Sequence, residues 1–174
     1  MKTALQFDFI VDKQNNTITV KREFAADLEL VWKAWTTAEL LDQWWAPAPC
    51  RAETKSMDFR EGGHWLYCMI VPGEGGSEAD QIHWGRQDFE KIVLHKKFSG
   101  TDIFCDENGS ANPELPRGRF ENVFSQETDG KTLVTIISTH NSLEELEMVM
   151  EMGFKEGFTM SLENLDNLLM TLKK

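Results

Sequence analysis

The histidines are the residues that could first suggest a metal centre. They are widely spaced, the sequence contains no H-E-x-x-H pattern, and no histidine is paired with a cysteine at the spacing of zinc ligands. The four histidines are His64, His83, His95 and His140. We therefore predict no metal site and no metal cofactor, and expect these histidines to lie along strands or loops.

The cysteines offer no better support for covalent chemistry. Cys50, Cys68 and Cys105 form no C-x-x-C pair, and the sequence contains no G-x-S-x-G nucleophile motif. An odd number of cysteines in a chain of this length indicates reduced thiols, which are typical of the cytoplasm. The first residues, MKTALQFDFIVDK, lack the apolar stretch of a signal peptide, and no apolar run is long enough to cross a bilayer. We therefore expect a cytoplasmic protein with no catalytic nucleophile and no membrane insertion.

The carboxylates are numerous, and most of them are expected on the outward faces of helices. The chain has 29 Asp+Glu against 18 Lys+Arg, which gives a net charge of −11 and an isoelectric point near 4.8. An acidic surface of this kind excludes binding to nucleic-acid phosphates and to anionic membranes. A general acid would have to be buried, and Asp88 and Glu90, on an aromatic-rich strand, are the carboxylates to consider.

The aromatic residues are the most unusual feature of the composition, with 6 Trp and 11 Phe but only 1 Tyr. Gly153 and Gly157 lie four residues apart, so they share one face of a predicted helix. Two interpretations remain open for these residues. The aromatic side chains could fill a close-packed core, or they could line a cavity in which the two glycines leave space.

The elements that would position these residues follow from their periodicity. Residues 4–24 alternate apolar and polar side chains around an Asn-rich turn, which predicts a β-hairpin. Asp27 and the run 36–39 are predicted N-caps of two short helices that end before Pro47. A capping box at Ser142 opens a helical pattern that continues to about residue 172, so we expect one helix of roughly thirty residues. Further strands are expected over 52–60, 64–71, 81–92, 96–105, 119–126 and 132–140, with loops over 72–80 and 106–116.

This order of elements predicts an α+β fold with an antiparallel sheet, since strands and helices are segregated along the chain. The 174 residues contain no internal repeat and suit a single domain over 1–174.

Several motifs together resemble the START-like (SRPBCC) superfamily, and within it the branch named for the C-terminal region of the Hsp90 ATPase activator. The helix motif V-W-x-A-W is present at 31–35, followed by W-W at 44–45. The turn D-x-R-x-G-G at 58–63 leads into W-x-Y-x-M at 65–69, and the terminal helix contains GFKEGF at 153–158. The resemblance extends from about residue 17 to 172.

The resemblance implies a helix-grip fold, in which a curved antiparallel sheet wraps around a long C-terminal helix and two short helices close one end. It also implies an apolar cavity between the sheet and that helix. The chain departs from the branch in two respects. It has Ile92-Val93-Leu94-His95 where the branch often has a proline pair, and it shows no counterpart of the separate N-terminal domain of the co-chaperone.

We therefore expect the protein to bind a small apolar or aromatic molecule in this cavity, with loops 72–80 and 106–116 as candidate gates. An enzyme of the cyclase or hydrolase type remains an alternative, with His64, His83, Asp88 and Glu90 as candidate acid–base residues. An Hsp90-type co-chaperone is a further alternative. The predicted cavity residues are Trp65, Tyr67, Met69, Trp84, Arg86, Phe120, Gly153, Gly157 and Met160, with Tyr67 and Arg86 as polar anchors.

Overall fold

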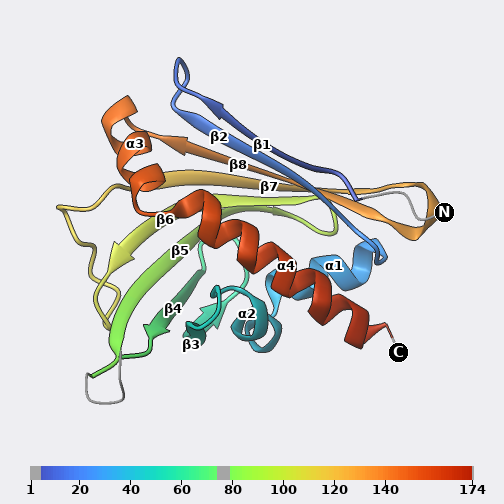
Figure 1. Ribbon diagram of the computed structural model, residues 1–174, viewed down its shortest axis with the longest axis horizontal. Helices are drawn as coiled ribbons and strands as arrows, with labels where there is room; N and C mark the ends of the chain where they lie inside the picture. The colour runs from blue at the N-terminus through green and yellow to red at the C-terminus, as the bar shows by residue number, and fades with distance from the viewer. Residues whose placement is uncertain (1–4, 74–78, 174) are drawn as a thin grey trace.

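The computed structural model describes residues 5–73 and 79–173, and its helices and strands are shown in Figure 1. The strands are β1 (Phe7–Asp12), β2 (Thr17–Phe24), β3 (Arg51–Asp58), β4 (His64–Val71), β5 (Gln81–Val93), β6 (Lys97–Cys105), β7 (Gly118–Gln126) and β8 (Thr132–His140). The helices are α1 (Leu28–Thr36), α2 (Ala38–Trp44), α3 (Leu143–Glu151) and α4 (Phe154–Leu172), and η2 (Thr128–Gly130) is a 3₁₀ turn.

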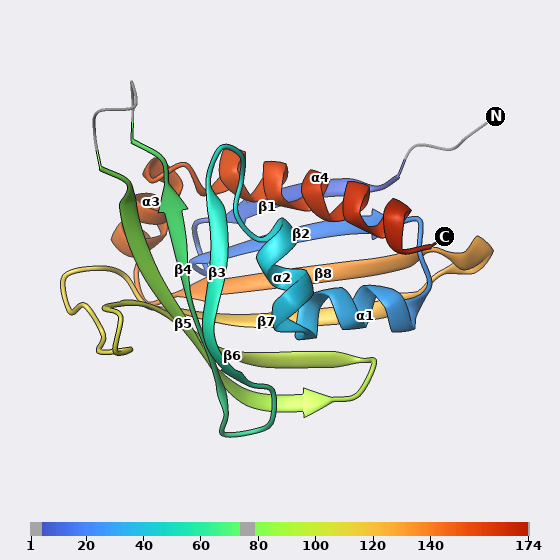
Figure 2. The same cartoon turned by 90° about the horizontal axis from the view of Figure 1, so that it is seen from below.

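The strands form one antiparallel sheet in the order β1-β2-β8-β7-β6-β5-β4-β3. The pairing of β2 with β8 brings the N-terminal hairpin beside the last strand of the chain. The sheet curves around α4, while α1 and α2 lie together at one end of the molecule (Figures 1 and 2). The predicted α+β helix-grip architecture is therefore confirmed.

Helices α1 and α2 begin where the sequence places their caps. The carboxylate of Asp27 accepts a hydrogen bond from the backbone N–H of Leu30 at 2.9 Å, which supplies a partner for one of the free amides of the first turn. Thr37, within the run 36–39 predicted to cap this helix, occupies the N-cap position of α2, but its side chain makes no capping hydrogen bond. Helix α1 buries Trp32 and Trp35 against the sheet.

The C-terminal helical segment is broken, and the prediction of one continuous helix is wrong. Helix α3 ends at Glu151 and α4 begins at Phe154, with Gly153 between them at φ +87°. That angle is left-handed backbone, which glycine adopts without the steric cost that a Cβ atom would impose. The periodicity remains helical on both sides of the break, and for this reason the apolar pattern did not reveal it.

The two halves of α4 differ in their surroundings. The C-terminal half is packed in the core through Leu162, Leu165 and Leu169, each at most 2% exposed. Asp166 of the same half pairs with the buried guanidinium of Arg22 on β2 at 3.3 Å. This half of the helix is therefore fixed to the sheet both by apolar burial and by a partly buried ion pair.

An aromatic cluster fills the space between α1 and the middle of the sheet. The Trp32 ring makes edge contacts with Phe98 and Phe124, at centroid separations of 5.7 and 5.0 Å. The indole N–H of Trp44, in α2, donates to the carbonyl of Ala34 at 2.9 Å, so its burial leaves no unpaired donor. Some of the aromatic residues therefore form a close-packed core.

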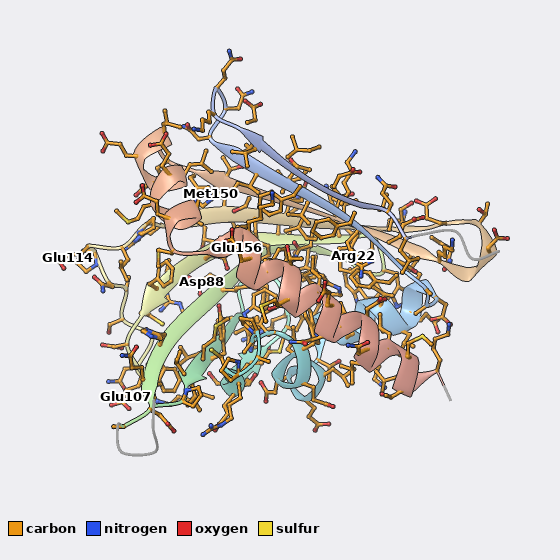
Figure 3. The ribbon with its side chains drawn as sticks, viewed as in Figure 1. Arg22, Asp88, Glu107, Glu114, Met150 and Glu156 are labelled. Carbon is orange, nitrogen blue, oxygen red and sulfur yellow. The ribbon has the colours of Figure 1, made fainter. Side chains whose placement is uncertain are left out.

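The segment 106–116 packs on the face of the sheet that points away from α4. Arg86 donates to the carbonyl of Gly109, and Lys55 donates to the carbonyl of Glu107 at 2.7 Å. Figure 3 labels Glu107 and Glu114 in this segment, at the end of the molecule opposite α1. None of the described helices is long and apolar enough to cross a membrane.

Candidate functional site

A cavity of about 390 Å³ lies between the sheet and the N-terminal half of α4. Its size falls within the range of pockets that enclose small organic molecules. The sheet contributes side chains from β4 to β8, α1 and the end of α2 contribute Trp35 and Trp45, and the break between α3 and α4 forms the opposite wall. The aromatic members of the lining are Trp35, Trp45, Tyr67, Trp84, Phe104, Phe120, Phe154 and Phe158.

Glycines create much of this space. A Cβ atom on Gly157 would meet only Pro47 Cγ, at 3.7 Å, so the helix presents little side-chain bulk to the cavity at this position. On the sheet, Gly118 lies between Asp102 and His140 in one row of paired residues. Two strand spacings separate Asp102 from His140, which corresponds to roughly 10 Å between their Cα atoms. The sheet therefore leaves a gap over Gly118 that is flanked by two titratable side chains.

Tyr67 forms the floor of the cavity on β4. Its ring stacks on Trp65 at 4.2 Å and lies over Gly85, where an added Cβ would sit 2.8 Å from the phenol oxygen. Burial, and secondarily the neighbouring Asp102, raises the pKa of the Tyr67 hydroxyl above its usual value. Tyr67 is therefore a neutral hydroxyl that can donate or accept a hydrogen bond.

Asp102 on β6 is the most perturbed acid that faces the cavity. Burial raises the pKa of its carboxyl to about 7, and the amide of Gln87, directly across the strand pair, opposes the shift. The side chain keeps some accessible surface because it lines the cavity. Near neutral pH this carboxyl can therefore act as a proton donor or as an acceptor.

His140 lies on β8, at the far end of the same row. Its Nε2 is 3.2 Å from Ser138 Oγ, and burial lowers the pKa of its imidazole. A neutral imidazole carries one donor and one acceptor nitrogen, so the ring can bind a ligand group of either kind.

Four buried side-chain atoms in the described part of the chain have no hydrogen-bond partner in the protein. They are Trp35 Nε1, Trp45 Nε1, Asn122 Oδ1 and His140 Nδ1. All four belong to residues that line the cavity. Unpaired buried polar atoms are costly, so a polar partner in the cavity would be favourable for those of the four atoms that face it.

The structure brings together most of the residues predicted for the cavity. Tyr67, Met69, Trp84, Phe120, Gly153 and Gly157 line it. The ring of Trp84, however, points to the outer face of the sheet, as Arg86 does two residues along β5, and lies 5.7 Å from the ammonium of Lys55.

Three predicted residues lie elsewhere. Trp65 is only 1% exposed and packs behind Tyr67, in the core. Arg86 points to the opposite face of the sheet, where it forms a two-bonded ion pair with Asp88 at 2.9 and 3.0 Å, so it is not a cavity anchor. Met160 is 42% exposed. Positions 157 and 161 of α4 face the cavity, and position 160 lies on a different side of the helix.

The acid–base candidates named from sequence are mostly outside the cavity. Asp88 is occupied by Arg86, and Glu90 pairs with Arg119 at 2.8 Å on the exposed surface. The imidazole of His64 lies 2.8 Å from Ser56 Oγ, within hydrogen-bonding distance, and points to the same face of β4 as Leu66. His83 is among the residues that line the cavity, but it is exposed.

Asp102 was missed, although the sequence holds a signal for it. Every second residue of β6 points inward, and these residues are Phe98, Gly100, Asp102 and Phe104. A single carboxylate therefore stands between aromatic residues on the inward face of the strand. The polar residues Asn122, Ser138 and His140 were not distinguished, since β7 and β8 carry polar side chains on both faces.

Loop 72–80, the first proposed gate, includes 74–78, which lie outside the described residues. The second, 106–116, is bonded to the outer face of the sheet, and only its last residue, Pro116, reaches the cavity. Across 5–73 and 79–173, no three His, Cys, Asp or Glu side chains come together in a group that could hold a metal ion.

Comparison with known proteins places this architecture in a family. The family model described as "Activator of Hsp90 ATPase homolog 1-like protein" matches residues 25–170. No curated protein shows significant similarity to the chain.

Solved structures are similar over nearly the whole chain. Protein Ms6760 from Mycobacterium smegmatis is 30% identical with a TM-score of 0.83, and the match covers 95% of this chain and 97% of that one. A protein from Arthrobacter aurescens is 28% identical with a TM-score of 0.83, covering 94% and 91%. A protein from Nitrosomonas europaea is 25% identical with a TM-score of 0.72, covering 91% and 97%. With its motifs, its helix-grip fold and the match over residues 25–170, the chain belongs to the Activator of Hsp90 ATPase homolog 1-like family.

Proposed function

We propose that the protein binds a small, largely apolar molecule in the cavity between the sheet and α4. The observation that supports this proposal is the combination of a space of about 390 Å³ with walls made mainly of aromatic and aliphatic side chains. Pockets of this size and character enclose most of the surface of a small organic ligand, and burial of apolar area then favours binding.

The helix-grip fold itself supports the proposal, because it is a fold that commonly binds hydrophobic ligands between sheet and helix. Here the space is built by local features of the sequence. Gly153 ends α3, and Gly157 keeps the first turns of α4 free of bulk on the inward side. Phe154 and Phe158 stack on each other at 5.3 Å between centroids and line the cavity from the helix side.

The proposal is tested with N-phenyl-1-naphthylamine, an uncharged probe whose fluorescence rises in apolar surroundings. We expect saturable binding to the wild-type protein. Gly157→Phe should remove it, because the new ring would occupy the cavity where only Pro47 lies near. Met160→Phe is the matched control, since it adds the same ring to the exposed side of the same helix.

Binding that survives Gly157→Phe would place the probe outside the cavity and contradict the proposal. Circular dichroism and thermal unfolding of both variants establish that loss of binding reflects a filled site in a folded protein. Native mass spectrometry of the protein purified from cell extract then identifies the mass of any retained molecule.

A further inference from the structure

The polar groups of the cavity have a charge pattern that restricts the ligand further. Among the described residues that line it there is no lysine or arginine, and the nearest arginine of the neighbouring strand, Arg86, points to the other face. The lining does contain the carboxyl group of Asp102, and the whole chain carries a net charge of −11. An anionic ligand would therefore enter without a counter-charge and beside an acid.

The position of Asp102 also favours a ligand group that donates hydrogen bonds. The gap over Gly118 separates Asp102 from His140, and an added Cβ at Gly118 would lie 3.4 Å from the imidazole. Gly118 itself adds no side chain between these two residues, and all three line the cavity of about 390 Å³, which provides room for a compact polar group. The His140 ring, 8% exposed, has its Nδ1 unpaired on the other side of this gap.

Aromatic rings line the same cavity. Tyr67 stacks on Trp65 below it, and Trp45 makes edge contacts with Tyr67 and Phe158 at 6.1 and 6.3 Å. Ring faces attract cations, most strongly where water is excluded. A carboxylate together with aromatic walls is a chemically suitable surrounding for an alkylammonium group.

We propose that the cavity selects an apolar molecule that carries a basic amine, with the amine beside Asp102, rather than a fatty acid or another anion. This inference rests on the proposed function, since it names the class of ligand for the same cavity. A bound ammonium group supplies the counter-charge that the buried carboxylate lacks, and its N–H groups donate to the carboxylate oxygens. The apolar part of the ligand lies against Trp45, Phe120 and Phe158.

The inference is tested with three probes that share one ring system: 2-(1-naphthyl)ethylamine, 2-(1-naphthyl)ethanol and 1-naphthaleneacetic acid. Dissociation constants are measured by calorimetry at pH 8 and pH 5 for the wild type, Asp102→Asn and Asp88→Asn. The two variants lose the same single negative charge, but Asp88 lies on the outer face of the sheet. Asp88→Asn therefore controls for general attraction of a cation to an acidic protein.

At pH 8 we expect the amine to bind the wild type about tenfold or more tightly than the alcohol, and the acid to bind most weakly, as charge-assisted bonds to a carboxylate predict. Asp88→Asn should keep that preference and Asp102→Asn should lose it. The preference should also disappear at pH 5, where the Asp102 carboxyl is protonated. The other titratable groups that face this space are Tyr67, His83 and His140, and α3 and α4 contribute none among the described lining residues.

Equal binding of amine and alcohol, tighter binding of the acid, or an amine preference that persists in Asp102→Asn would overturn the inference. If the alcohol binds in the cavity without any amine preference, the inference fails and the proposed function stands. If none of the three probes binds and the neutral fluorescent probe also fails, both are refuted.

Discussion

Replacing Asp102 by asparagine should stabilise the protein, and should do so more at alkaline than at acidic pH. Asparagine has nearly the same shape as aspartic acid but cannot ionise. In the folded protein the Asp102 carboxyl has a pKa of about 7, against 3.8 for the unperturbed group. The folded state therefore binds an extra proton between these values. Its stability is highest at low pH and falls as pH rises through the folded pKa.

The size of the effect follows from the same pKa shift. Integrating proton binding for a pKa that moves from 3.8 to about 7 gives a difference of about 2.5–3 kcal/mol between pH 5 and pH 8.5. For a chain of this length, each kcal/mol corresponds to about 2–4 °C in melting temperature. The Asp102→Asn variant should therefore gain about 5–12 °C in melting temperature over the wild type on moving from pH 5 to pH 8.5.

The measurement is urea unfolding of both proteins at the two pH values, followed by tryptophan fluorescence. Comparing variant with wild type at each pH cancels the titration of the other acidic groups. An equal shift in midpoint at both pH values, or a variant that is less stable at pH 8.5, would refute the assignment of Asp102 as a buried, readily protonated acid.

Three further substitutions test the geometry around the cavity by thermal or urea unfolding. Gly153→Ala should destabilise by about 1–2 kcal/mol, because alanine is strained at φ +87°, and an unchanged stability would argue against the break between α3 and α4. Gly85→Ala should lower the free energy of unfolding by about 1–3 kcal/mol and weaken probe binding, since its Cβ would meet the Tyr67 ring at 2.8 Å. Unchanged stability together with unchanged probe binding would contradict the packing of that ring. Trp44→Phe should lower the free energy of unfolding by about 2–4 kcal/mol, because it leaves a void and removes the hydrogen bond to the Ala34 carbonyl. An unchanged free energy of unfolding would show that the site repacks.

Periodicity and turn chemistry predicted the elements of the fold well. Strand 64–71 was placed at its observed bounds, and the hairpin and the order of strands follow from period-two alternation between turn residues. The helix break was not predicted, because one glycine at left-handed φ does not interrupt an apolar pattern that continues on both sides.

The cavity was harder to predict than the fold, for a physical reason. Strand β4 is apolar on both faces, so the sequence does not show which face points inward. Trp65 and Tyr67 lie on the same face and differ only in their position along the strand, so the sequence also does not distinguish Trp65 in the core from Tyr67 in the cavity wall. Arg86 and Asp88 lie two residues apart on β5, so both side chains point to the same, outer face of the sheet, and the sequence did not show which face that was. The alternation of Phe98, Asp102 and Phe104 along β6 is visible in the sequence, but the structure was needed to show that this face points into the cavity.

The division of α4 into an anchored half and a cavity-lining half has a consequence for how the protein can change during evolution. Leu162, Leu165, Leu169 and the pair of Asp166 with Arg22 hold the helix in the fold. The residues that shape the cavity, Phe154, Gly157 and Phe158, belong to a separate stretch of the same helix. Substitutions in that stretch can alter which molecule fits while the anchored half maintains folding, so one scaffold can acquire new ligand preferences by small steps.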